Sequence, residues 1–575
     1  MKTEFSKDLD MTTHVAIMLS FVLAFAACQQ SPPAIEEPEA AVSLDLPPGV
    51  ETATEAINEE TLKAHTASLS SDEFEGRAPA SPGDEKARQY LQDTLASLGL
   101  EPGAQDGAWQ QRFAIMSITS EAPEVWSFEG QDGSLDLASW DDFIAGSGVQ
   151  SEKALIDDAE LVFVGYGIEA PEYDWDDIKG ADLEGKVLLM MNNDPDWDPE
   201  LFEGDRRLYY GRWTYKYEVA ARHGAAGAII IHTTLSAGYP WQVVQASWTG
   251  AQFELPAGDE PRSQVSAWIT EEAARSLVAV SGHELDALRE SARSRDFQPV
   301  PLGITTSLLL NNSIDSVETG NVAGLLEGSD PILKNEVVVY SAHHDHFGIG
   351  EPNDEGDNIY NGALDNAAGC GKVLTIADAF TRLPEPPRRS VLFLFVAGEE
   401  QGLIGSEYYA KNPTFPPGRI AANVNIDGAN IFGRTSDVAY IGFGKSTLDD
   451  VVVAAAARQG RTVVGDQFPD RGSFYRSDQF NFSKIGVPAI YADSGTTYIG
   501  RPDGWGKEQA EAWESVHYHQ PSDEMTDDWN FEGIIEDTVL AFEAGLSIAQ
   551  TEELPSWTPG DEFEAVRIQA LAELD

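Results

Sequence analysis

Histidine and carboxylate side chains follow directly after apolar runs at three places in the second half of this 575-residue chain. The residues at these places are His343, the pair Glu399 and Glu400, and Asp427. Imidazole and carboxylate without thiolate form the ligand set that suits zinc in a hydrolytic site. Five of the ten histidines also fall into two tight groups, at 343, 344 and 346 and at 517 and 519, which favours metal binding over isolated structural roles. The pattern therefore predicts metal-dependent hydrolysis.

The segment after the first apolar run contains three histidines, and extended backbone separates their roles. Side chains alternate between the two sides of an extended segment, so His343 and Asp345 share a side while His344 points away. We therefore expect His343 to bind a metal and Asp345 to hold its second ring nitrogen, as metal-bound histidines commonly require. His346 falls on the opposite side from His343, and we interpret it as a supporting or structural residue.

Glu399 and Glu400 are adjacent carboxylates at the end of an apolar run. Their charges repel, and their burial is unfavourable unless a cation compensates. A metal ligand next to a general base would resolve this conflict. A solvated charge pair that opens a helix is the alternative interpretation.

The elements that position these residues predict an α/β fold. Short apolar runs without alternation suit strands that are buried on both faces. The carboxyl ends of such strands line the ligand crevice of open α/β sheets. Helical stretches fall between the runs, at 371–380, 406–411 and 448–458.

The rest of the chain divides by composition. Val15–Ala27 is apolar and Cys28 follows it, which predicts a signal peptide over 1–28 and export to the periplasm, the cell envelope or the medium. Cys28 as the lipidated residue of an outer-membrane lipoprotein is one alternative, and it would be the only membrane attachment.

Residues 29–55 are rich in Pro, Glu and Ala and predict a flexible linker. Short apolar runs, turns and many aromatic residues over 150–310 predict a compact β-rich module.

The charge of the chain excludes one class of partner. A total of 96 acidic and 37 basic residues gives a net charge of -59. Such a surface repels nucleic acid and anionic membranes, so we expect no nucleic-acid partner. A solvated acidic surface is the simple explanation, and a specific cationic partner is the alternative. Nothing in the sequence indicates the oligomeric state.

Five polar segments occur in a fixed order over about 180 residues: Ala342–His346, Gly362–Gly369, Glu399–Ser406, Asn425–Asp427 and Tyr518–Asp523. In these segments the sequence resembles family twenty-eight of the metallopeptidases (clan MH), which groups double-zinc aminopeptidases, aminopeptidase Y and glutamate carboxypeptidases. The resemblance implies a three-layer, mixed-sheet zinc-peptidase domain of the phosphorylase/hydrolase-like type, formed by 56–149 and 311–575. Residues 150–310 are similar to the protease-associated domain that is often inserted in these enzymes.

For the metal site, the resemblance implies two Zn²⁺ ions. It places His343 and Asp427 on one ion and Glu400 and His519 on the other, with Asp365 as the bridging ligand.

For catalysis, the resemblance implies Glu399 as the general base and Asp345 as the residue that orients His343. Tyr518 would donate its hydroxyl to the tetrahedral intermediate. A cis peptide bond is expected after the bridging aspartate, between Asp365 and Asn366.

These implications predict a zinc-dependent exopeptidase that acts on peptides, with an aminopeptidase as the leading interpretation. A carboxypeptidase or dipeptidase of the glutamate carboxypeptidase type is the alternative, and it needs basic residues to hold a terminal carboxylate. Arg476 and Arg471 are candidates for that role, although Arg476 and Asp478 could instead form a structural salt bridge. A metal-free binding or receptor relative is a third interpretation, but every ligand position holds the expected residue type.

Overall fold

The computed structural model of this protein describes residues 43–130, 133–199, 201–353 and 355–574. The predicted signal peptide (1–28) with Cys28, and the first part of the predicted linker (29–55), lie outside these residues. The linker ends earlier than predicted, because helix α1 (Val50–Ala53) buries its first and last residues in the core. Within the described ranges, no helix combines the length and the apolar character that crossing a membrane requires.

Four parallel strands carry the residues that the sequence places at strand ends. β14 (Val337–His343) is flanked by β17 (Ser390–Val396) and β18 (Ile420–Asn425), and β21 (Ala489–Ser494) continues the sheet beyond β18. Every residue of β14, β17 and β18 is buried, as expected for apolar runs without alternation. Because these strands run in one direction, their carboxyl ends meet at one edge of the sheet.

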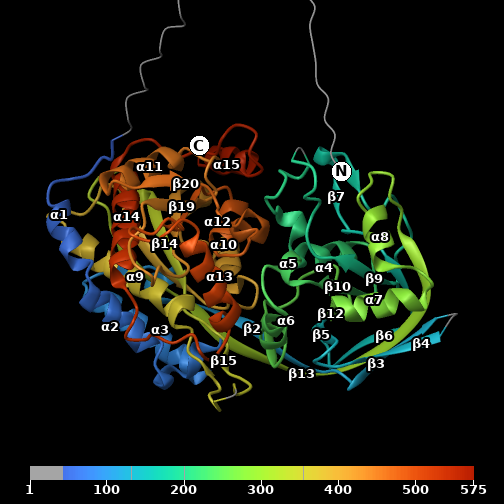
Figure 1. Ribbon diagram of the computed structural model, residues 1–575. Helices are drawn as coiled ribbons and strands as arrows, with labels where there is room; N and C mark the ends of the chain where they lie inside the picture. Colours follow the sequence, from blue (N-terminus) through green and yellow to red (C-terminus); the bar gives the residue numbers. More distant parts are fainter. Residues whose placement is uncertain (1–42, 131–132, 200, 354, 575) are drawn as a thin grey trace, which may run out of the picture. The chain divides into compact units, whose positions relative to one another are not determined.

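Helices cover both faces of these strands, which gives the predicted three-layer α/β arrangement (Figure 1). Neighbouring residues of β14 belong to different buried clusters, Tyr340 to one and Val339 to another. Neighbouring side chains of a strand point to opposite faces, so the two clusters lie on opposite sides of the sheet. The helices are α9 (Ala368–Thr381) and α14 (Phe531–Gln550) on the first face, and α10 (Ile404–Lys411) and α12 (Gln479–Lys484) on the second.

Strand β13 (Val300–Leu326) makes the sheet mixed. Its last residues pair antiparallel with β17, and its middle pairs antiparallel with β2 (Gln110–Glu121). Its first half pairs antiparallel with β6 (Lys153–Phe163). β13 therefore runs through the domain boundary predicted at residue 310 and belongs to both parts of the chain.

Residues 125–310, which we call the insert, form most of a separate buried cluster, which also includes Phe474, Phe480 and Trp557 from the last part of the chain. Strand β10 (Gly227–His232) lies between β9 (Val187–Met191) and β12 (Val265–Thr270), and all three are parallel. Helix α4 (Trp213–Arg222) lies within the aromatic-rich stretch of the insert. The insert core begins earlier than the predicted residue 150, because Trp126 packs within it.

Candidate metal centre

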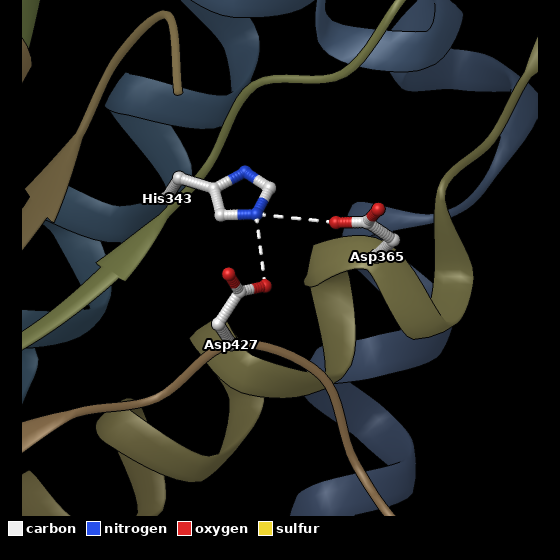
Figure 2. Close-up of side chains that lie close together, drawn as sticks. All are labelled: His343, Asp365 and Asp427. Atoms are coloured by element: carbon white, nitrogen blue, oxygen red, sulfur yellow. Dashed lines mark hydrogen bonds and ion pairs between the residues drawn. The ribbon is translucent and has the colours of Figure 1, made fainter. Parts of the chain in front are cut away.

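The carboxyl ends of β14 and β18 bring His343 and Asp427 together, and the short helical turn Ala363–Ala367 before α9 adds Asp365 (Figure 2). His343 Nε2 lies 3.1 Å from Asp365 Oδ1 and 3.3 Å from Asp427 Oδ1. Figure 2 shows one ring nitrogen of His343 facing both carboxylates. All three side chains are largely buried, and together they form a group able to hold a metal ion.

A second group of donors shares Asp365. His519 Nε2 lies 3.0 Å from Glu400 Oε2 and 3.4 Å from Asp365 Oδ2. The two carboxylate oxygens of Asp365 therefore face two different histidines. All five side chains predicted as metal ligands lie in these two adjoining groups.

The placement of the donor atoms fits metal ions of the zinc type. His519 Nε2 is buried and makes no hydrogen bond within the described part of the chain, although two carboxylate oxygens lie within 3.4 Å. Atoms placed in this way flank a common centre instead of pointing at one another. In the first group, ligand atoms of His343, Asp365 and Asp427 lie within 4.8 Å of one another. Ligand bonds to zinc of about 2 Å fit such spacing.

The electrostatics of the site show that it lacks positive charge. Burial disfavours a charge on His343, but the carboxylates around it, Glu399 first, outweigh burial and raise its pKa well above the ordinary value. Burial also opposes a charge on His519, whereas Glu400 raises the pKa of His519 to about 9. Burial, followed by the charges of Asp427 and Glu400, raises the pKa of Glu399 well above its usual range. Divalent cations would supply the missing charge.

Asp345 supports both the histidine and the glutamates. Its carboxylate lies 3.8 Å from His343 Nδ1, on the side away from the candidate metal position, and its backbone carbonyl is the hydrogen-bond partner of that nitrogen at 3.3 Å. The carboxylate also accepts the backbone N–H groups of Glu399 at 3.1 Å and Glu400 at 3.3 Å. The sequence predicts the first contact only. Asp345 thus joins the end of β14 to the turn that presents both glutamates.

The other two histidines of the first cluster face different neighbours. His344 points away from the metal centre, and its Nε2 lies 3.0 Å from Asp84 Oδ1. His346 Nδ1 lies 2.6 Å from Glu400 Oε1, so it holds the oxygen of Glu400 that does not face His519. This contact is consistent with the supporting role expected for His346.

Loop contacts that the ligand pattern does not reveal fix Asp365. The peptide bond between Asp365 and Asn366 is cis, as the resemblance implies. The Asn366 side chain donates to the Ile426 carbonyl at 3.0 Å and accepts the Gly428 N–H at 2.9 Å. Asp523 accepts the N–H of Asp365 at 3.1 Å. Sequence reasoning assigned no role to Asn366 or Asp523, although both lie in the family-like segments.

Tyr518 lies beside His519, with ring centroids 3.8 Å apart. Its hydroxyl accepts a hydrogen bond from Arg476 Nη2 at 3.1 Å. Arg476 and Asp478 form no salt bridge in the part of the chain that the structure describes, so the ion pair considered for them is absent there. Arg471 pairs with Glu514 instead.

Two cavities open onto the metal centre. One, of about 400 Å³, is lined by Asp365, Glu399 and Asp427 together with apolar side chains. The other, of about 520 Å³, lies between the metal centre and the insert and is lined by Glu399, Glu400, His519 and Arg212. Tyr518 and Arg476 border both cavities.

Arg212 is an unexpected feature of the second cavity. It is 8% exposed, and its buried Nε has no hydrogen-bond partner among the described residues. Burial, followed by the positive charge of Arg476, lowers the pKa of Arg212 to about 9. Two arginines therefore lie near each other beside the metal centre, although the chain as a whole is strongly acidic.

Comparison with known proteins finds a family match for the part of the chain that holds this geometry. Residues 321–543, which include all five candidate ligands, match the sequence profile of peptidase family M28, so the predicted resemblance to that family is confirmed over this part, while the protease-associated domain stays a prediction. Leupeptin-inactivating enzyme 1 of Streptomyces exfoliatus is 28% identical over 229 residues, which are 39% of this chain and 47% of that protein. A vacuolar membrane protease of Verticillium alfalfae is 35% identical over 99 residues, 17% of this chain and 8% of that protein.

This chain thus spans less than half the length of these two curated relatives. Among solved structures, an aminopeptidase from Aneurinibacillus sp. strain AM-1 superposes with a TM-score of 0.52 at 18% identity. The superposition covers 88% of this chain and 97% of that one. At this level of identity the likeness establishes the fold.

Proposed function

We propose that this protein is a zinc-dependent exopeptidase that removes residues from the amino end of peptides. The observation that carries the proposal is the position of Asp365, whose two oxygens face His343 and His519 from two adjoining donor groups. The match to peptidase family M28 supports it, as does the similarity to proteins described as an aminopeptidase and a probable leucine aminopeptidase. The insert would be a protease-associated domain.

The proposed site holds two Zn²⁺ ions. His343 and Asp427 would bind one, Glu400 and His519 the other, and Asp365 both. Zinc supplies a Lewis acid and lowers the pKa of water toward neutrality.

Glu399 is the proposed general base. Its side chain lines both cavities and lies outside the two donor groups described above, although its carboxylate is close to ligand atoms of His343 and Glu400. It would take the proton of the attacking water and deliver that proton to the leaving amine. Because Arg476 donates to the Tyr518 oxygen, the Tyr518 hydroxyl hydrogen remains free to stabilise the developing oxyanion.

The first cavity suits the side chain of the residue to be removed. Its apolar lining includes Phe432, Ile441 and Trp513, which favours an apolar first residue. The carboxylates of the metal centre at its edge would attract the free amine.

A second candidate function is a dipeptidase or carboxypeptidase. The observation that favours it is the guanidinium pair of Arg212 and Arg476, neither of which forms an ion pair among the described residues, although Glu514 interacts with Arg476 electrostatically. Guanidinium groups bind carboxylates through paired, charge-assisted hydrogen bonds. A peptide carboxylate in the second cavity would restrict hydrolysis to short peptides.

Mass spectrometry of matched peptides tests both candidates. The substrates share one sequence and differ in a free or acetylated amino end and a free or amidated carboxyl end. We expect cleavage to require the free amino end, to stop after chelation and to return when Zn²⁺ is added. Trimming of acetylated peptides from the carboxyl end would overturn the aminopeptidase and favour the second candidate, and chelator-resistant cleavage would contradict both.

A further inference from the structure

The insert reaches the candidate metal centre through one hydroxyl group. Ser247 is the last residue of α6 (Trp241–Ser247) (Figure 1), and its Oγ lies 3.0 Å from His519 Nδ1. The two residues are separated by 272 positions in the chain. His519 uses its other ring nitrogen, Nε2, to face Glu400 and Asp365. Ser247 thus contacts the nitrogen of His519 that a metal would leave free.

The chemistry of a metal-bound imidazole determines which group donates the hydrogen bond between His519 and Ser247. A neutral histidine that binds metal through Nε2 keeps its proton on Nδ1. That N–H would donate to Ser247 Oγ, which fixes both the tautomer and the ring plane. Partners of this kind commonly change metal affinity by about 10–100-fold when they are removed.

The position of Ser247 is set by the insert. Val243 and Val244 of α6 are buried in a cluster with Ile230 and Trp268 of the insert strands. At the start of the helix, Trp241 Nε1 donates to the Trp140 carbonyl at 3.0 Å. The Ser247 hydroxyl therefore reaches His519 from a helix that packs on the insert strands and not on the sheet of β14, β17, β18 and β21.

We propose that Ser247 is a positioning residue for His519, so that the insert raises the affinity of the peptidase-like part for the metal ion held by Glu400 and His519. The inference rests on the proposed function for the identity of that ion. It gives the insert a role in building the metal centre, beyond bordering the second cavity. The ion at His343 and Asp427 does not depend on Ser247.

Zinc titration of the full chain tests the proposal without substrate. Metal-free wild type and Ser247→Ala compete with a chelating dye for Zn²⁺, which reports the affinity and number of sites. We expect one site to weaken by about 10–100-fold and the other to stay unchanged. Ser247→Thr, which keeps the hydroxyl, should restore the affinity.

Thr249→Ala is the matched control. Thr249 lies two residues beyond Ser247, and its hydroxyl donates to the Gln245 carbonyl at 2.6 Å without a contact to His519. We expect this variant to bind zinc like the wild type. Equal weakening by Thr249→Ala and Ser247→Ala would mean that disturbance of the α6 end is responsible, and it would overturn the proposal.

A double-mutant cycle separates positioning from general structural damage. In a His519→Ala background, Ser247→Ala should cause no further loss of zinc affinity, because the ring that it orients is gone. A further loss of the original size would overturn the inference. Wild-type zinc affinity in Ser247→Ala, with peptide cleavage intact, would also overturn the inference. That result would leave the proposed function unaffected. A wild-type protein that takes up no zinc would instead remove the proposed function and the inference with it.

Discussion

The two histidines of the metal centre are held in contrasting ways. His343 ends a fully buried central strand, and Asp345, two residues later, lies beside its outer nitrogen. His519 lies outside regular structure with a φ of 57°, and its outer nitrogen contacts Ser247 of the insert. One half of the site is therefore built from local sequence and the sheet, and the other half depends on a contact between distant parts of the chain. The difference shows that, among the described residues, the insert contacts one half of the candidate site and not the other.

Glu399 lines both cavities beside the candidate metal centre. Its replacement should have the largest effect on turnover. Glu399→Gln removes the proposed base and keeps the shape of the side chain, so we expect turnover to fall by at least ~100-fold with zinc content unchanged. Steady-state kinetics with metal analysis of the same sample measures both. Near-normal turnover would rule out Glu399 as the base.

The His343 half can be tested through Asp345. Asp345→Asn keeps one acceptor but removes the charge that faces His343 and the second oxygen that accepts a backbone N–H. We expect zinc affinity at the His343 site to fall by about 10–100-fold, and turnover to fall as well. Zinc titration should show the loss at the site that Ser247→Ala leaves intact. If Asp345→Asn and Ser247→Ala weakened zinc binding at the same site, the His343 and His519 sites would not be supported separately as described above.

Arg212 tests whether the insert also contributes to substrate binding. If a peptide carboxylate occupies the second cavity, Arg212→Gln should raise KM about tenfold for short peptides with a free carboxyl end. Amidated peptides should be unaffected. Arg471→Gln is the control, since Arg471 is already paired with Glu514. An equal change for both peptide forms would mean that Arg212 does not bind the carboxylate.

The smallest expected effect concerns the stability of the insert in acid. Burial lowers the pKa of His232 to about 4, although its hydrogen bond to the Tyr239 carbonyl opposes the shift. The folded pKa is below the unfolded value of about 6.5, so below that pH the unfolded chain takes up a proton at His232 more readily than the folded protein. The free energy of unfolding is therefore highest above pH 6.5 and decreases as pH falls toward 4. Between pH 7 and pH 5 the loss should be about 2 kcal/mol.

His232→Gln, which keeps an N–H donor, should remove this part of the pH dependence and leave turnover at pH 7 unchanged. Thermal unfolding of both proteins at pH 7 and pH 5 measures it. An identical acid shift in wild type and variant would show that His232 does not contribute.

The sequence locates the candidate ligands of the sheet half at the ends of strands, for a physical reason. Strands that are buried on both faces are largely apolar, so a histidine or a carboxylate such as His343 or Asp427 at their ends stands out. Alternation along extended backbone also separates His343 from His344, and the structure places their side chains on different neighbours.

The insert half could not be predicted in the same way. Ser247 and Arg212 lie in segments without a distinctive pattern, and their importance arises only when the insert packs against the peptidase-like part. The sequence pointed to Arg471 as a residue that could hold a terminal carboxylate, but Arg471 pairs with Glu514. Arg212 lies nearly 270 residues before Arg476, so the sequence does not reveal that these two arginines lie near each other. The predicted insert boundaries also failed to match the elements, because β13 is one strand that serves both cores.

Anomalous X-ray scattering at the zinc absorption edge, from crystals of the zinc-loaded protein, tests the central claim most directly. Two peaks are predicted, one between His343 and Asp427 and one between Glu400 and His519, with Asp365 beside both. A protein that is fully active without zinc at these positions, or peaks coordinated by other residues, would contradict the account.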